Sequence, residues 1–204
     1  MRKPSESYLK LKKATDKILS GAGLVVLSPV FAGIAIAIKA EDGFTAPVFF
    51  KQKRTGFKGK EFNCYKFRTM KVNANSDQLQ ASRHDPRKTR VGEFLRKTSL
   101  DELPQFINVF VGDMSVVGPR PHMVKHTQDY SKIIDKYMLR HLIKPGITGW
   151  AQVNGYRGET RELWQMERRV EYDVWYIEHW NFWLDIKIIF LTVVNAFRGE
   201  KNAF

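Results

Sequence analysis

The chain has 204 residues, of which 43% are hydrophobic and 13% aromatic, and this length fits one core and one domain better than two. The 34 Lys and Arg exceed the 21 Asp and Glu, and the formal charge of +13 favours anionic partners such as nucleic acid, acidic lipid head groups or phosphorylated substrates. A single cysteine, Cys64, excludes an intramolecular disulfide framework and a Cys-x-x-Cys metal site. We expect Cys64 to be a small, half-buried residue of an extended segment.

The first predicted element is the uncharged run over residues 18–38. A helix needs about 20 apolar residues to cross the hydrocarbon core of a bilayer, so this run predicts membrane contact. Pro29 cannot donate a hydrogen bond to the carbonyl of Val25, and its ring clashes with the preceding turn, which predicts a kink at Ser28 and Pro29. The hydroxyl of Ser28 can satisfy the freed carbonyl.

Both flanks of this run, residues 1–17 and 39–60, are rich in Lys and Arg. The positive-inside rule places both flanks in the cytoplasm, which a straight span cannot satisfy. A helix that enters, bends at Ser28-Pro29 and returns to the same face can satisfy it, so residues 18–38 are predicted to form a re-entrant membrane helix. An ordinary transmembrane anchor remains open. A signal peptide is disfavoured, because the run exceeds the roughly 7–15 apolar residues of a signal sequence.

The rest of the chain predicts an α+β fold that is mostly helical. Segments 47–54 and 61–70 are rich in aromatic residues and flank a turn-rich stretch, which predicts a small β-hairpin. Apolar spacing predicts helices over 90–96 and 103–110, and Gly and Pro predict a loop over 112–121, around which we expect the chemistry. A second long helical stretch is predicted over 162–197. Its many Trp and Tyr suit an amphipathic helix at a membrane interface or an aromatic core helix about equally.

The segment Thr-Ser-Leu-Asp-Glu-Leu-Pro-Gln at 98–105 is the most informative one. Ser99 and Glu102 have the spacing of a capping box, which predicts a helix start and leaves Asp101 free. In a first helical turn the helix dipole would keep Asp101 ionised, and the free N–H groups there can hold a phosphate. Asp101 is therefore a candidate nucleophile in phosphoryl transfer and a candidate Mg²⁺ ligand.

Several cations are candidates for binding a phosphate near this segment, namely Lys66, Arg68, Arg96 and Arg120. Arg120 lies between Pro119 and Pro121, which restrict its backbone and lower the entropy lost when its guanidinium pairs with both oxygens of a phosphate.

Two further patterns are weaker. His122 and His126 are four residues apart, as a metal pair on a helix would be, but no third ligand is evident and we assign no metal site. Residues 144–155 have the Gly and Pro content of a binding loop, in which Trp150 could stack on a base, although a structural turn is the default interpretation.

Taken together, these motifs resemble the bacterial sugar transferase family, the monotopic phosphoglycosyl transferases that begin assembly of capsule, exopolysaccharide and glycoprotein glycans. The resemblance covers nearly the whole chain. It is carried by Ser28-Pro29 in the apolar helix and by the segments 65–70, 97–105, 112–121 and 144–149.

The resemblance implies one catalytic domain over 1–204, at the cytoplasmic face of a bacterial inner membrane with both termini cytoplasmic. It implies that Asp101 attacks the β-phosphate of a UDP-sugar and releases UMP, and that the sugar phosphate then passes to undecaprenyl phosphate. Asp101 would also contact Mg²⁺, and Glu102 would assist as its partner carboxylate. The substrate phosphates would lie near Lys66, Arg96, Pro119, Arg120 and Pro121.

The end of the chain and residues 153–158 look like larger relatives that transfer glucose or galactose phosphate, which often carry several N-terminal transmembrane helices and an extra soluble domain. We expect either a short natural form or a catalytic fragment. The sequence does not specify the hexose, the polyprenol length, the pathway or the oligomeric state.

Two other functions compete with this one. A basic module that binds RNA or acidic lipid without chemistry would explain the charge, but it gains nothing from the adjacent carboxylates of Asp101 and Glu102, so we expect no nucleic-acid partner. A glycosyltransferase that moves the sugar without its phosphate would release UDP in place of UMP.

Overall fold

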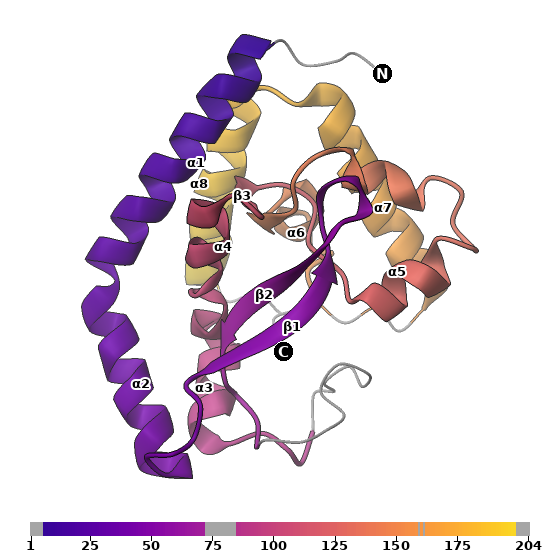
Figure 1. The fold of residues 1–204 in the computed structure, drawn as a ribbon. Coiled ribbons are helices and arrows are strands. Elements are labelled where there is room, and N and C mark those ends of the chain that lie inside the picture. Colours follow the sequence, from indigo (N-terminus) through magenta and orange to yellow (C-terminus); the bar gives the residue numbers. More distant parts are fainter. Residues whose placement is uncertain (1–5, 72–84, 159, 161, 199–204) are drawn as a thin grey trace.

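The structure is a computed structural model that describes residues 6–71, 85–158, 160 and 162–198 (Figure 1). Its helices are α1 (Glu6–Val26), α2 (Ser28–Asp42), α3 (Arg90–Lys97), α4 (Gln105–Val111), α5 (Val124–Tyr130), α6 (Trp150–Val153), α7 (Leu163–His179) and α8 (Phe182–Arg198). Its strands are β1 (Phe49–Thr55), β2 (Glu61–Phe67), β3 (Ser115–Val117) and β4 (Gly146–Thr148). Three 3₁₀ turns are η1 (Phe57–Gly59), η2 (Leu100–Glu102) and η3 (Tyr137–Leu142). The predicted α+β, mostly helical fold is confirmed.

The first two helices form one long rod along a side of the molecule, with a bend of 57° between them (Figure 1). Pro29 lies in the first turn of α2 and gives no N–H to the carbonyl of Val25. The hydroxyl of Ser28 donates to the carbonyl of Val25 at 2.8 Å. The kink predicted at these two residues is confirmed, whereas the helical segment extends well beyond the predicted 18–38.

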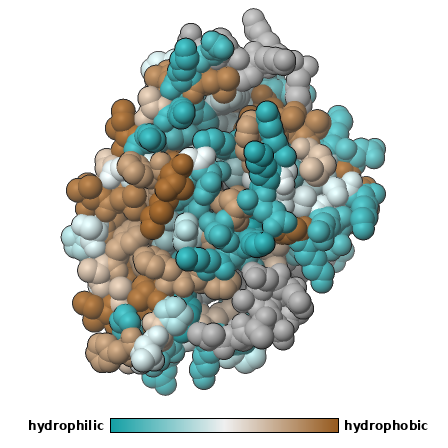
Figure 2. All heavy atoms as spheres, in the orientation of Figure 1, coloured by the Kyte–Doolittle hydropathy of each residue, from teal (hydrophilic) through white to brown (hydrophobic). Residues whose placement is uncertain are grey.

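This bent pair is the part of the molecule that meets the requirements of a membrane segment. In the described portion of the chain no single helix is long and apolar enough to cross a bilayer, but α1 and α2 pass the test of length and hydropathy together. In Figure 2 hydrophobic residues gather over the side that this pair occupies, and Val25, Val26 and Ile36 are largely exposed there. By length and composition this bent pair is a candidate membrane segment, and its contact with a membrane stays a prediction.

The hairpin is the predicted one. Strands β1 and β2 pair antiparallel, with Gln52 opposite Cys64. Phe67 at the end of β2 contacts the ring of Phe31 on α2, with ring centroids 5.0 Å apart. Cys64 is fully buried in β2, deeper than predicted, and burial raises the pKa of its thiol, so it is a packing residue.

The end of α2 is fastened to the start of α3. The carboxylate of Glu41 accepts hydrogen bonds from the backbone N–H groups of Arg90 and Val91, at 2.7 and 2.9 Å. These are N–H groups that a helix start leaves without a partner, so Glu41 caps α3 from another helix. Asp42 pairs with Arg68 on the strand side at 2.8 Å. Helix α2, the hairpin and α3 thus form one unit, and α3 leads directly into the turn that carries Asp101.

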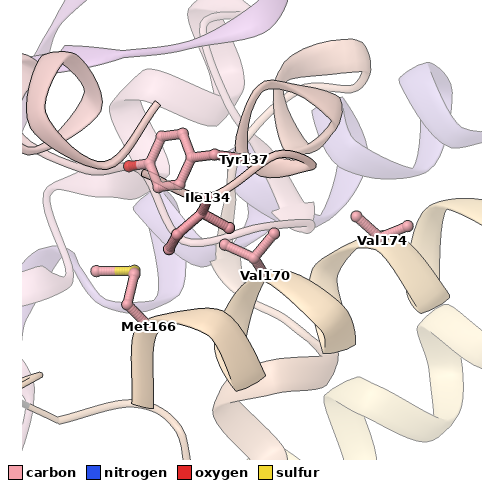
Figure 3. Packing of buried hydrophobic residues seen from close by; sticks show 5 residues of the cluster. All are labelled: Ile134, Tyr137, Met166, Val170 and Val174. Carbon is pink, nitrogen blue, oxygen red and sulfur yellow. The ribbon is translucent and has the colours of Figure 1, made fainter. Parts of the chain in front are cut away.

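A cluster of buried hydrophobic residues packs α7 against η3 and the residues before it, and is shown in Figure 3. It consists of Ile134, Tyr137, Met166, Val170 and Val174. The helical stretch predicted over 162–197 is confirmed, but Trp180 and Asn181 divide it into α7 and α8. The side chain of Asn181 accepts a hydrogen bond from the N–H of Leu184 and so begins α8.

The aromatic residues of these two helices divide between core and surface. Tyr176 is buried and donates a hydrogen bond to Asp185, whereas Trp164 and Trp183 are exposed. The core interpretation is therefore confirmed for Tyr176, and contact of the exposed Trp residues with a membrane interface stays a prediction.

Candidate active site

Asp101 and Glu102 lie in the short turn η2, between α3 and α4. Ser99 precedes this turn in the left-handed conformation, with φ of 57°, and its side chain forms no cap hydrogen bond. The predicted capping box is therefore wrong, because the carboxylate of Glu102 turns away from Ser99 toward a group of cations. Both carboxylate residues are buried, with exposed fractions of 7% for Asp101 and 6% for Glu102.

Glu102 is surrounded by three cations from three distant parts of the chain. The guanidinium of Arg120 donates two hydrogen bonds to it at 2.6 and 3.1 Å, and Lys66 donates one at 2.7 Å. Arg157 lies at 3.5 Å. Burial alone would raise the pKa of Glu102, but Arg120 and Lys66 outweigh burial and hold that pKa well below its usual range. Glu102 is thus ionised at neutral pH.

Asp101 has the opposite environment. Lys66 Nζ is 3.8 Å from one of its oxygens, and among the described residues neither oxygen accepts a hydrogen bond. Burial raises the pKa of Asp101, which Lys66 partly counters and Glu102 reinforces. The predicted stabilisation by a helix dipole is wrong, because Asp101 lies in a 3₁₀ turn and α4 begins only at Gln105. Asp101 is the carboxylate of the pair that accepts no hydrogen bond from a described residue.

The predicted cations differ in how they relate to this pair. Lys66 and Arg120 reach Glu102 directly. The Nε of Arg96 donates to the hydroxyl of Thr69 at 3.0 Å, and burial lowers the pKa of Arg96 while Asp101 opposes that shift. Arg68 pairs with Asp42 instead. Lys66, Arg96, Arg120 and Arg157 together carry more positive charge than the two carboxylates neutralise, which suits a phosphorylated ligand.

The backbone on each side of Arg120 is held by close contact between two glycine-containing segments. Strands β3 and β4 pair in parallel, which corrects the prediction of a plain loop over 112–121. A Cβ at Gly146 would lie 2.1 Å from the backbone nitrogen of Gly118, so only glycine permits this approach. Residues 144–149 therefore act as a structural support for the Arg120 loop, in agreement with the default interpretation of that segment.

Pro119 and Pro121 flank Arg120 as predicted, and both line a small pocket. The pocket is shared with the residues Thr55, Gly56, Arg120, Arg140, His141, Ile143 and Pro145. Among the hydrogen bonds and ion pairs of the described residues, neither proline contacts Asp101 or Glu102.

The weaker candidates belong to the packing of the protein. His122 is buried before α5 and shares a hydrogen bond with the hydroxyl of Tyr137 at 2.7 Å. The described residues contain no group of three or more His, Cys, Asp or Glu side chains that could hold a metal ion. Trp150 stacks on Trp175, with Lys187 Nζ 5.6 Å above its ring, so this packing gives no support to base stacking.

Two residues of the site were missed by the sequence analysis. Arg157 lies between Gly155 and Gly158, and this glycine-rich context was the only available signal of a loop that approaches a ligand. The side-chain oxygen of Asn108 accepts from the N–H of Tyr65 at 2.9 Å, and its amide donates to the carbonyl of Asn63 at 2.7 Å. Asn108 thereby ties α4 to the strand that carries Lys66.

The chain was compared with known proteins. A family model described as "Bacterial sugar transferase" matches residues 7–199. A UDP-glucose:undecaprenyl-phosphate glucose-1-phosphate transferase of Escherichia coli (strain K12) is 55% identical over 188 residues, which are 92% of this chain and 40% of the relative. A protein of the same name from Xanthomonas campestris pv. campestris is 50% identical over 202 residues, 98% of this chain and 41% of the relative.

A more distant relative has a different substrate in its name. A UDP-N-acetylgalactosamine-undecaprenyl-phosphate N-acetylgalactosaminephosphotransferase of Aeromonas hydrophila is 38% identical over 198 residues, 96% of this chain and 46% of the relative. The chain thus spans less than half the length of each of these three relatives.

Proposed function

Because the chain belongs to the bacterial sugar transferase family, we propose that it transfers a hexose 1-phosphate from a UDP-sugar to undecaprenyl phosphate, as the first membrane step of exopolysaccharide, capsule or other glycan synthesis. The names of the relatives at 50–55% identity favour glucose as the hexose. The observation that carries the proposal is the contrast between Asp101, which has an available carboxylate, and Glu102, whose carboxylate is occupied by three cations.

In the first step the carboxylate oxygen of Asp101 attacks the β-phosphorus of the UDP-sugar. A bond forms between that oxygen and phosphorus, and the bond from phosphorus to the oxygen that bridges the two phosphates breaks. UMP leaves with the bridging oxygen, and the sugar phosphate remains on Asp101 as an acyl phosphate ester. Asp101 suits this role, because a nucleophile must not be held by strong hydrogen bonds when it attacks.

In the second step a phosphate oxygen of undecaprenyl phosphate attacks the same phosphorus. The bond to Asp101 breaks, the carboxylate is restored, and the product is an undecaprenyl diphosphate sugar. Neither step requires an oxidant or a further co-substrate. Two successive displacements on one aspartate also imply that the nucleotide leaves before the lipid acceptor reacts.

The surrounding charges supply the stabilisation that phosphoryl transfer needs. Charge spreads over the oxygens of the transferred group in the transition state, so catalysis rests on positioned cations. Arg120 and Lys66 are held in place by Glu102, which is the residue next to the nucleophile in the sequence. We assign Glu102 the role of organising these cations, and we assign Lys66, Arg96, Arg120 and Arg157 to the substrate phosphates.

The residues of the site also fit one Mg²⁺ ion. Mg²⁺ is typically held by one or two carboxylates together with phosphate oxygens of the substrate, and Asp101 offers one such carboxylate. Glu102 is a poor ligand, because its oxygens already accept hydrogen bonds from Arg120 and Lys66. When bound, the ion would neutralise charge on the diphosphate.

We further propose that α1 and α2 form a re-entrant membrane segment at the cytoplasmic face of the bacterial inner membrane, with both termini cytoplasmic. The bend of 57°, the exposed apolar residues near it and the Lys and Arg on both flanks support this arrangement. An acceptor that is itself a membrane lipid gives the protein a reason to be embedded.

The test is the nucleotide that is released. Detergent-purified protein is mixed with Mg²⁺, undecaprenyl phosphate and a panel of UDP-sugars, and UMP and UDP are separated by chromatography. UMP from the wild type, with none from Asp101→Asn, would support phosphoglycosyl transfer and identify the sugar. Asp129→Asn is the matched control, because Asp129 is an exposed aspartate on α5. Release of UDP would indicate transfer of the sugar without its phosphate. Release of neither UMP nor UDP would favour a membrane module without catalysis.

A further inference from the structure

Arg120 and Arg157 reach Glu102 from loops. In each loop a buried arginine donates a hydrogen bond to the backbone at or next to the residue that reaches Glu102. The guanidinium of Arg140 donates to the backbone carbonyl of Arg120 at 2.8 Å. Arg169 donates to the backbone carbonyl of Gly158, the residue after Arg157, at 2.7 Å. In both cases a rigid, charged donor fixes the main chain at or next to a cation of the site.

Both of these contacts depend on one face of α7, although only Arg169 lies on that helix. Arg140 lies in η3 and is held by Asp173 of α7. Arg169 lies on this helix, and Asp173 lies one turn later. Asp173 accepts hydrogen bonds from Arg140 Nη2 at 2.6 Å and from Arg140 Nε at 3.1 Å. The side chains of Arg140 and Asp173 are only 1% and 2% exposed, so this ion pair is closed to solvent.

His122 lies between the two buried arginines. Arg140 and Arg169 both direct a guanidinium nitrogen toward its ring. Burial, followed by the charges of Arg140 and Arg169, holds the pKa of His122 well below its usual range, so the ring is neutral. The His122 ring thus connects Arg140, which binds the Arg120 backbone, to Arg169, which binds the backbone after Arg157. It does so without adding a third positive charge.

The position of α7 is also secured by apolar packing, which meets the polar cluster at Tyr137. Met166, Val170 and Val174 pack against Ile134 and Tyr137 (Figure 3). A helix anchored by such packing transmits its position to the groups bound to it, because closely packed interiors deform little.

We propose that Arg169 and Asp173 on α7 are positioning residues that set the placement of Arg157 and Arg120 around Glu102 and hence around the phosphates of the substrate. This inference rests on the proposed function, since it assigns Arg120 and Arg157 to those phosphates. Arg169 acts through the backbone of the Arg157 loop, and Asp173 acts through Arg140 on the backbone of the Arg120 loop. Neither residue is expected to touch the substrate.

The decisive experiment is a double-mutant cycle between Arg169 and Arg157. Arg169→Met removes the donors while retaining most of the side-chain length, and Arg157→Ala removes the cation that is being positioned. We expect Arg169→Met to lower kcat roughly 10- to 100-fold, because a small misplacement of a catalytic group has effects of that size. We expect KM for the UDP-sugar to change less, because the arginines act mainly on charge that develops in the transition state.

The cycle separates positioning from general damage to the fold. In the Arg157→Ala background, Arg169→Met should have almost no further effect on kcat, since the residue that it positions is gone. Arg168→Met is the matched control, because Arg168 is the exposed neighbour of Arg169 on the same helix and pairs only with Glu171 in the described ion pairs. It should leave kcat unchanged. If Arg169→Met fails to fold, the cycle is run with Arg169→Lys, which keeps the charge and should retain part of the activity.

The same design applies to Asp173. Asp173→Asn should be strongly non-additive with Arg120→Ala and additive with substitutions outside the cluster. Additive effects in both cycles would overturn the inference while UMP release by the wild type kept the proposed transferase intact. A wild type that releases no UMP would overturn the proposed function itself, and the inference would fall with it.

Discussion

The guanidinium of Arg120 donates two hydrogen bonds to the carboxylate of Glu102, at 2.6 and 3.1 Å. Glu102 is thus held by a bidentate ion pair, whereas its neighbour Asp101 has no such partner among the described residues. Two neighbouring carboxylates thereby acquire different properties from their contacts. Three consequences of this difference can be measured, and a fourth prediction concerns the bend between α1 and α2.

The two carboxylates should affect stability in opposite directions. Glu102→Gln leaves Lys66 and Arg120 without their charged partner and should lower the free energy of unfolding by roughly 1–3 kcal/mol. Asp101→Asn should leave the melting temperature equal to or above that of the wild type, because burial disfavours the ionised form of Asp101. Thermal melts of the two variants at neutral pH provide the comparison. A lower melting temperature for Asp101→Asn than for Glu102→Gln would contradict this asymmetry.

The stability contribution of Glu102 should depend on pH in a defined direction. The pKa of Glu102 is held below its ordinary value of 4.5 in the folded protein, so its contribution is fully present above that value. It should be lost as the pH falls from 4.5 through the lower folded pKa. Denaturation of the wild type and of Glu102→Gln across this range should therefore show a difference that shrinks on acidification, and a constant difference would argue against the ion-pair explanation.

The pH dependence of turnover should report on Asp101. The nucleophile must be ionised, and burial raises its pKa above the ordinary 3.8, so kcat/KM should fall at a higher pH than an exposed aspartate would give. Mg²⁺ bound at the carboxylate favours the ionised form, so a higher Mg²⁺ concentration should shift this acid limb to lower pH. An acid limb that does not respond to Mg²⁺ would separate the metal from Asp101.

The bend between α1 and α2 should be sensitive to Pro29. Pro29→Ala restores an N–H that can bond to Val25, so the rod should straighten and move one flank across the membrane. Single cysteines at Lys10→Cys and Lys60→Cys, both exposed positions, can be labelled from either side of sealed vesicles, since Cys64 is buried. Pro47→Ala, a proline outside the helices, is the control. Cytoplasmic labelling of both positions in Pro29→Ala would show that the proline does not set the topology.

The sequence was most informative where local chemistry determines structure. A proline inside a helical segment removes a backbone hydrogen bond and bends the helix, so the kink at Pro29 could be predicted. The turn residues around Gly56 likewise favoured a hairpin. Asp101 and Glu102 could be selected because adjacent carboxylates near several candidate phosphate-binding cations suit phosphoryl transfer and serve no purpose in a binder of anions. The roles of Ser99 and Glu102 were misjudged, because capping-box spacing is a local signal, and the distant cations Lys66 and Arg120 compete for the same carboxylate.

The remaining features depend on contacts between residues far apart in sequence. Three features have no periodic signature along the chain. They are the approach of Arg157 to Glu102, the parallel pairing of β3 with β4, and the contacts of α7 with Gly158 and with Arg140. The break at Trp180 was hidden, because apolar spacing continues across it and only the capping side chain of Asn181 marks it. Such features become visible only when the tertiary arrangement is known.

The cap that Glu41 places on α3 links the end of α2 to the segment that leads into Asp101. In the proposed re-entrant arrangement, the depth of α2 in the bilayer therefore sets the height of the nucleophile above the lipid head groups. Undecaprenyl phosphate presents its phosphate at a level fixed by its own tail. Bilayers of different hydrophobic thickness would then shift the donor site and the acceptor phosphate relative to each other, and the rate of the second step would vary with the acyl-chain length of the surrounding lipid.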